Sequence, residues 1–116
     1  KDNTGLIVCI ALNYGSRLEI QKAVKNIAEL YKQGKIALND ITDELISGNL
    51  DTSQMPDPDL IIRTSGEQRL SNFMLYQASY SEFYFTDVHW PDFGKKAYAD
   101  ALNEYAGRKR RFGDVK

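Results

Sequence analysis

The stretch Asp59–Asp87, DLIIRTSGEQRLSNFMLYQASYSEFYFTD, decides the fold of this chain. It begins with a short apolar run, Leu60–Ile62, between turn-forming residues, which is typical of a buried strand. The aromatic residues at 83–86 predict a second strand. Between the strands, Ser71 is expected to cap an apolar helix that runs from Asn72 to about Ser79. A strand, a helix and a strand in this order indicate a parallel sheet.

The loop after the first strand, RTSGEQR at Arg63–Arg69, has the composition of an anion site. Arginine donates two parallel hydrogen bonds to a phosphate group, and the start of the predicted helix would add free N–H groups. Loops at the carboxyl edge of a parallel sheet commonly bind ligands. The alternative is that Arg63 and Arg69 pair with nearby carboxylates and only solvate the loop, because surface ion pairs are common and weak. The carboxylates within reach would be Glu67, Asp59 and Asp87.

The rest of the chain predicts one further strand and three helices. Leu6–Leu12 is apolar without alternation, as in a strand covered on both faces. Ser16 and Glu19 have the spacing of a capping box for the first helix. The predicted helices cover residues 18–33, 38–46 and 94–108, and the proline-containing segment 47–58 is expected to be a surface loop or, alternatively, a mobile flap. The order of elements predicts an α/β fold, a parallel β-sheet with flanking helices.

The composition limits the possible functions. A formal net charge of −1 over 116 residues does not indicate a nucleic acid as the main partner. One cysteine excludes an internal disulfide and fits a cytoplasmic protein, and one cysteine with one histidine argues against a zinc site built by this chain. No apolar run approaches the roughly 20 residues of a membrane span. The chain also lacks the usual glycine-rich nucleotide-binding motifs.

The residues that remain point to a diphosphate. Several arginines with one acidic residue, Glu82, fit a diphosphate carried with Mg²⁺, because the carboxylate would hold the metal and the arginines the phosphate oxygens. The alternative for Glu82 is an exposed carboxylate at the edge of a strand. The single histidine, His89, has no motif around it that would make it catalytic.

At this point the sequence resembles a known family. The segment IIRTSGEQRLSNFMLYQASYSEFYFTDVHWPDF, followed by RKRRFG, is similar to the C-terminal half of the cis-prenyltransferases, most of all the undecaprenyl diphosphate synthases. LNYGSR and the strand before it also match, so that the likeness covers essentially all 116 residues. The resemblance implies that residues 1–116 are the C-terminal part of one domain. The family's N-terminal half, with its aspartate-containing phosphate loop and its D-G-N-x-R-W motif, is absent from the chain.

The resemblance also implies roles for single residues. Arg63, Arg69 and Ser71 match groups that bind the diphosphate of isopentenyl diphosphate. Glu82 matches a glutamate of the magnesium and isopentenyl diphosphate site, with Mg²⁺ as the implied cofactor. Gln68 stands where some bacterial members have a histidine proposed as a metal ligand, and it is therefore left out of the metal site.

Two further motifs match the family near the ends of the chain. Arg111 and Gly113 match a C-terminal R-x-G motif that reaches across a homodimer toward the partner's diphosphate site. Asn13 and Arg17 match a turn at the rim of the active site. The family's homodimers are thus an implied partner arrangement for this chain.

The implied activity is the condensation of isopentenyl diphosphate with an allylic diphosphate such as farnesyl diphosphate. The product would be a cis-polyprenyl, undecaprenyl diphosphate, the lipid carrier for peptidoglycan and cell-wall synthesis, with at most peripheral membrane association through that lipid. This fragment would hold the isopentenyl diphosphate half-site and be inactive alone. The alternatives are a non-catalytic partner subunit, a diphosphate-binding interaction module or an unrelated diphosphate-binding protein. Inactive partners often lose acceptor-site residues, and these are present here: Arg63, Glu67, Arg69 and Ser71.

Overall fold

The computed structural model of the chain describes residues 4–113. Its main elements are α1 (Ser16–Lys32), α2 (Asp43–Gly48), β1 (Leu60–Arg63), β2 (Glu82–Phe85) and α3 (Lys95–Gly107). Short 3₁₀ helices lie at Leu38–Asp40, Gln77–Tyr80 and Trp90–Asp92.

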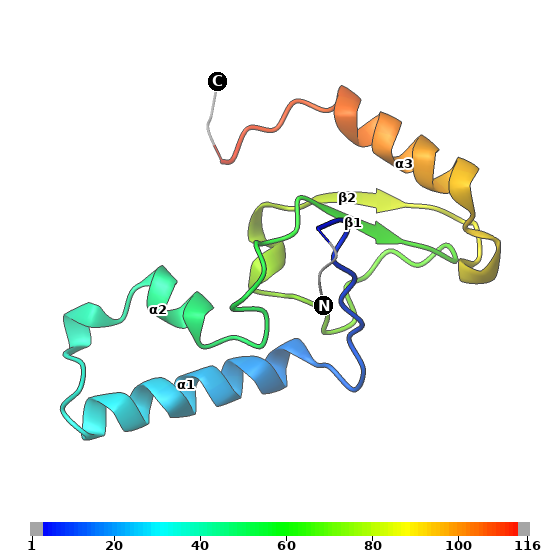
Figure 1. The fold of residues 1–116 in the computed structure, drawn as a ribbon. Helices are drawn as coiled ribbons and strands as arrows, with labels where there is room; N and C mark the ends of the chain where they lie inside the picture. The colour runs from blue at the N-terminus through cyan, green and yellow to red at the C-terminus, as the bar shows by residue number, and fades with distance from the viewer. Residues whose placement is uncertain (1–3, 114–116) are drawn as a thin grey trace.

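The two strands form a parallel sheet, as the sequence predicts. Leu60 lies opposite Glu82 at one end of the sheet, and Arg63 lies opposite Phe85 at the other. In Figure 1, α3 runs along β2, while α1 and α2 lie together on the other side of the strands. The α/β class with a parallel sheet and flanking helices is therefore confirmed.

Helix α1 forms as predicted but buries a different face. Its buried residues are Ser16, Glu19, Ala23 and Ile27, which share one side at helical spacing. The apolar residues of this helix that recur at helical spacing predict a different buried stripe: Ile20, Val24, Ile27, Ala28 and Tyr31. Of these, Val24 and Tyr31 are exposed. The helix is followed by Gly34 at a φ of 69°, the left-handed conformation that commonly ends helices.

The predicted capping box at the start of α1 is wrong. Gly15 occupies the N-cap position without a side-chain hydrogen bond, and Ser16 is already helical. The Oγ atom of Ser16 instead accepts a hydrogen bond from the backbone N–H of Leu75, 3.0 Å away. A contact with a distant segment has thus replaced the local cap.

Three other predicted elements differ from the structure. Leu6–Leu12 forms no strand, because no neighbouring strand within the described residues pairs with it, and its side chains are exposed. The helix expected over 38–46 divides into a 3₁₀ turn and α2, which is capped by the Thr42 hydroxyl. The helix expected from Asn72 is a series of turns that ends in the 3₁₀ helix Gln77–Tyr80.

The helices of the described range 4–113 are too short or too polar for a membrane span. None of them combines the necessary length with the necessary apolar character.

Candidate functional site

The loop after β1 is fixed by the segment that follows β2. The backbone N–H of Thr86 donates to the carbonyl of Arg63, and the N–H of Gly66 donates to the carbonyl of Thr86, both at 3.0 Å. Ser65 donates to Val88 at 2.9 Å. These bonds extend the contact between the two strands beyond their ends, so the loop that carries the arginines leaves the sheet in a defined direction.

Gly66 allows this loop to turn. Its φ is 69°, and a Cβ atom added there would lie 3.1 Å from the Oδ1 atom of Asp87. A side chain at this position would therefore meet both an unfavourable backbone conformation and a close neighbour.

We expect Gly66→Ala to lower the free energy of unfolding by about 1–2 kcal/mol, the usual cost of a left-handed non-glycine residue. Chemical denaturation of the purified chain measures this difference. Gly107→Ala is the matched control, because a Cβ at Gly107 meets nothing within 4 Å and its φ is not positive. Equal stability of the two variants would show that the loop relaxes without cost.

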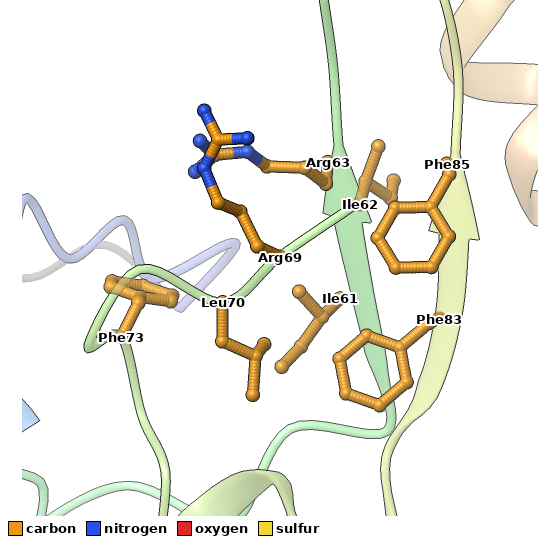
Figure 2. Close-up of a pocket in the computed structure, with 8 residues that line it drawn as sticks. All are labelled: Ile61, Ile62, Arg63, Arg69, Leu70, Phe73, Phe83 and Phe85. Carbon is orange, nitrogen blue, oxygen red and sulfur yellow. The ribbon is translucent and has the colours of Figure 1, made fainter. Parts of the chain in front are cut away.

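Two arginines stand at the mouth of a small pocket beside the sheet. Its volume is about 200 Å³, and its lining consists of Ile61, Ile62, Arg63, Arg69, Leu70, Phe73, Phe83 and Phe85. Figure 2 shows the guanidinium groups of Arg63 and Arg69 close together at one end, with the apolar and aromatic side chains below them. The structure thus combines a cationic end, suited to an anion, with an apolar wall.

One of the predicted ion pairs exists within this loop. Arg69 pairs with Glu67, and its side chain is 63% exposed. Asp59, another expected partner, pairs instead with Arg110. An exposed pair of this kind contributes little to stability, so Arg69 can exchange Glu67 for a bound anion at small cost.

The segment after Arg69 is a strained turn and not a helix start. Ser71, Asn72 and Met74 all have positive φ values, between 48° and 62°. Without a helix here, the predicted contribution of helix N–H groups to anion binding is wrong. Ser71 is exposed and follows Arg69 closely, and its predicted contact with a diphosphate remains a prediction.

The predicted rim residues lie beside this turn. The backbone N–H of Arg17 donates to the Oδ1 atom of Asn72 at 2.9 Å, and Ser16 donates to the Asn72 carbonyl at 2.8 Å. Tyr14 makes an edge-to-face contact with Phe73, with ring centroids 5.6 Å apart. Phe73 lines the arginine pocket, whereas Asn13 and Tyr14 line a separate cavity that shares Phe73 with it.

Glu82 and the basic tail lie at the other end of the sheet. Glu82 pairs with Arg108 at 3.0 Å, and Arg108 also donates to the carbonyl of Phe83 at 2.7 Å. The Glu104 carboxylate, and after it Glu82, raise the pKa of Arg108 above its ordinary value. The pairing therefore holds a charged guanidinium against the amino end of β2.

The tail folds back on its own chain. The guanidinium of Arg110 lies 4.4 Å from the ring centroid of Phe112, and Phe112 in turn contacts Tyr80. Arg111 is exposed, and Gly113, with a φ of 80°, lies next to Tyr80. Whether the R-x-G motif of Arg111 and Gly113 reaches a partner subunit remains a prediction.

The structure therefore brings some predicted site residues together and separates others. Arg63 and Arg69 share a pocket at one end of the sheet, while Asn13 lines the neighbouring cavity and Arg17 is bonded to the turn that follows Ser71. Because Arg63 lies three positions after Leu60 in β1, the end that carries Glu82 is roughly 10 Å away. Within one chain, the tail and Glu82 do not border the arginine pocket.

The described residues do not by themselves fit a Mg²⁺ ion. Within residues 4–113 there is no group of three acidic, histidine or cysteine side chains that could hold a metal. Glu82, the one predicted ligand, already accepts a hydrogen bond from Arg108. A role for Glu82 in metal binding stays a prediction. A Mg²⁺ ion at Glu82 would need further ligands from outside residues 4–113.

A buried polar cluster that the sequence did not predict lies behind the site. Glu19 and Gln77 are 1% and 2% exposed, and they are joined by a hydrogen bond of 2.9 Å. Tyr14 also donates to Glu19; its burial, and then this hydrogen bond, raise the pKa of Tyr14 above its ordinary value. The available signal was the position of Glu19, which lies at helical spacing with Ala23 and Ile27 and therefore on the face that is buried. Its spacing to Ser16 favoured a capping box instead.

The chain belongs to the undecaprenyl diphosphate synthase family. The family model described as "Putative undecaprenyl diphosphate synthase" matches residues 1–113. The parallel sheet and flanking helices agree with that assignment, because the solved structures that resemble this chain are cis-prenyltransferases.

Its relatives share about half of its residues. The chain is 53% identical over 115 residues to an isoprenyl transferase of Bacillus thuringiensis subsp. konkukian, covering 99% of this chain and 45% of the relative. It is 54% identical over 115 residues to the ditrans,polycis-undecaprenyl-diphosphate synthase ((2E,6E)-farnesyl-diphosphate specific) of Micrococcus luteus, covering 99% and 46%. The chain thus spans somewhat less than half the length of these curated relatives.

A solved structure has the same fold. Lavandulyl diphosphate synthase from Lavandula x intermedia, crystallised in complex with dimethylallyl diphosphate, aligns with a TM-score of 0.84 and 44% identity. The alignment covers 87% of this chain and 44% of that protein.

Proposed function

We propose that this chain is the C-terminal half of a cis-prenyltransferase of the undecaprenyl diphosphate synthase type and carries its half-site for isopentenyl diphosphate. The observation that carries the proposal is the pair of arginines, Arg63 and Arg69, above an apolar pocket. The diphosphate would lie on the guanidinium groups and the short isoprene unit against the aromatic wall. Both halves of that ligand thus find suitable chemistry.

Three further observations support the substrate class. The family model and the Micrococcus luteus relative are undecaprenyl diphosphate synthases by name. The structural relative was crystallised with dimethylallyl diphosphate, an allylic diphosphate. We extend these names to this chain as the proposal that the whole enzyme joins isopentenyl diphosphate to farnesyl diphosphate and makes undecaprenyl diphosphate, the carrier for peptidoglycan synthesis, in the cytoplasm.

In this proposal the residues of this chain bind and orient the acceptor. Arg63 and Arg69 hold the diphosphate, and Ser71 adds a hydroxyl donor beside them. The pocket wall of Ile61, Phe83 and Phe85 excludes water from the isoprene double bond, which attacks the allylic carbon and then loses a proton. Mg²⁺, supplied with ligands from outside the described residues, would neutralise the leaving diphosphate.

The experiment that tests the proposal is the assay of this chain continued at its N-terminus by the remaining part of the enzyme. With isopentenyl diphosphate, farnesyl diphosphate and Mg²⁺, this longer protein should form cis-polyprenyl diphosphates. Binding of isopentenyl diphosphate without prenyl transfer would favour the alternative, a non-catalytic partner subunit. Absence of any diphosphate binding would contradict both.

We also predict self-association. The aromatic segment around β2 includes Tyr80, which is 64% exposed, and several half-buried residues. An apolar surface of this kind commonly marks a protein interface, and the implied homodimer would cover it. The residues expected to line part of it are Met74, Tyr76, Tyr80, Phe83 and Tyr84.

Light scattering of the purified chain at high micromolar concentration should therefore give the mass of a dimer. Tyr80→Lys should shift the chain toward the monomer, because it places a charge in the apolar surface. Tyr31→Lys is the control, since Tyr31 is 49% exposed on α1 and is not part of the proposed surface. A monomer for the unmodified chain would contradict the prediction.

A further inference from the structure

Gln77 is a buried polar side chain behind the candidate site, and by volume it is the largest of the fully buried side chains among the described residues. It is 2% exposed, and its Nε2 atom donates to Glu19 at 2.9 Å and to the hydroxyl of Thr52 at 2.8 Å. The carboxylate of Glu19 can only accept, which fixes the orientation of the amide. Among the described residues, the Oε1 atom of Gln77 has no hydrogen-bond partner. The chain thus leaves one buried acceptor unsatisfied in order to make these two bonds.

Gln77 belongs to a cluster that joins four segments. Glu19, on α1, also accepts from the backbone N–H of Asp51 at 3.0 Å and from the hydroxyl of Tyr14. The cluster therefore ties α1 to the loop at 51–52, to the turn at Tyr14 and, through Gln77, to the 3₁₀ helix. Bonds to an ionised group that is shielded from water are among the strongest in a protein.

The strained turn Ser71–Met74 lies just before Gln77 in the sequence. Ser71, Asn72 and Met74 hold left-handed backbone conformations that cost free energy unless surrounding contacts fix them. Ser16 holds the turn itself: its backbone N–H donates to the carbonyl of Asn72, and its hydroxyl oxygen accepts from the N–H of Leu75. Beyond the turn, the N–H of Ala78 donates to Met74 at 2.8 Å, and Gln77 is the side chain that anchors this end to α1.

We propose that Gln77 is a positioning residue for the diphosphate-binding arginine. By holding the end of the Ser71–Met74 turn on Glu19 and Thr52, it fixes the backbone from which Arg69 projects and the place of Phe73 in the pocket wall. This inference rests on the proposed function, because Arg69 is taken to bind isopentenyl diphosphate. Gln77 itself touches no substrate in this role.

The test uses the full-length enzyme that contains this chain, with separate Michaelis constants for isopentenyl and farnesyl diphosphate. Gln77→Leu keeps the approximate volume and removes both bonds. We expect it to raise the Michaelis constant for isopentenyl diphosphate about tenfold, with kcat and the constant for farnesyl diphosphate nearly unchanged. A merely structural role would lower the active fraction, and hence kcat, without changing the Michaelis constant.

The matched control is Gln33→Leu. Gln33, the residue that caps the C-terminal end of α1, donates to Glu29 at the same 2.9 Å, but on the exposed surface. The Gln33→Leu variant should leave the Michaelis constants for isopentenyl and farnesyl diphosphate unchanged. Should Gln77→Leu fail to fold, Thr52→Val removes one acceptor of Gln77 with little change in shape, and a smaller rise in the same constant is expected. An unchanged constant in Thr52→Val and in any folded Gln77→Leu would overturn the proposal.

A second variant, Gln77→Glu, adds a readout that packing alone would not change. At neutral pH the new carboxylate faces Glu19 and repels it, whereas at low pH its protonated form can donate to Glu19 again. The other titratable group that contacts this pair is Tyr14. Asp51 meets Glu19 through its backbone N–H, and its carboxylate pairs with Lys22 at the surface. The ratio of the Michaelis constant for isopentenyl diphosphate in Gln77→Glu to that in the unmodified enzyme should therefore fall toward one as the pH is lowered. A ratio that does not depend on pH would contradict the proposal.

The proposed function is tested separately in the same assay. If Arg69→Ala leaves the constant for isopentenyl diphosphate unchanged, the proposed function fails. If Arg69→Ala raises it and the Gln77 variants do not, only the positioning role fails.

Discussion

The purified 116-residue chain should transfer no prenyl group from farnesyl diphosphate to isopentenyl diphosphate, even with Mg²⁺. Catalysis of this kind depends on metal and cationic groups placed where the leaving diphosphate gains charge. The described residues offer two arginines at one end of the sheet but no cluster of three metal-binding side chains. The acceptor can therefore be bound while the departing group is left unstabilised.

A radiolabelled assay for polyprenyl products measures this expectation. The control is the same chain continued by the remaining part of the enzyme, assayed at the same concentration. Multiple turnovers by the 116-residue chain alone would contradict the expectation and would show that the half-site contains more of the catalytic machinery than the arginine pocket.

Arg69→Ala should weaken the binding of isopentenyl diphosphate about tenfold or more and hardly change the melting temperature. The side chain is 63% exposed, and within residues 4–113 its ion pair is with Glu67; such surface pairs are worth about 0–1 kcal/mol. A charge-assisted bond to a diphosphate is worth more, roughly 1.5–3 kcal/mol, and each 1.4 kcal/mol is a tenfold change in affinity. Arg69→Lys should restore only part of the loss, because lysine keeps the charge but lacks the planar fork.

Two measurements on the full-length enzyme decide the question: the Michaelis constant for isopentenyl diphosphate and the melting curve without ligand. Lys96→Ala is the control, because Lys96 is 90% exposed, pairs with Asp100 and lies on α3, away from the pocket. It should alter neither value. An unchanged Michaelis constant for Arg69→Ala, together with a clearly lower melting temperature, would make Arg69 a structural residue and remove a main support of the half-site.

Much of the fold could be predicted because it follows from local patterns. The apolar run at Leu60 and the aromatic run at Phe83 become strands because such residues suit a half-buried pleated surface. The periodic apolar residues of α1 and α3 form helices within two residues of the expected bounds. The parallel arrangement followed from the order of these elements.

The local patterns failed where distant contacts compete with them. Ser71 has the composition of an N-cap, but the segment after it is held in turns by hydrogen bonds to Ser16 and Arg17, more than 50 residues earlier. Leu6–Leu12 has the composition of a buried strand, but a strand needs a partner, and the described residues provide none.

By itself, then, the sequence determined β1 and β2, the arginine-bearing loop after β1, and the long helices α1 and α3. Only the tertiary structure decided which of the candidate residues lie close together. It set Arg63 and Arg69 over one pocket, put Glu82 and the basic tail at the opposite end of the sheet, and buried Glu19 against Gln77. The physical reason is that backbone propensity acts over a few neighbouring residues. Pairing of charges and burial of polar groups depend instead on segments that meet only after the chain has folded.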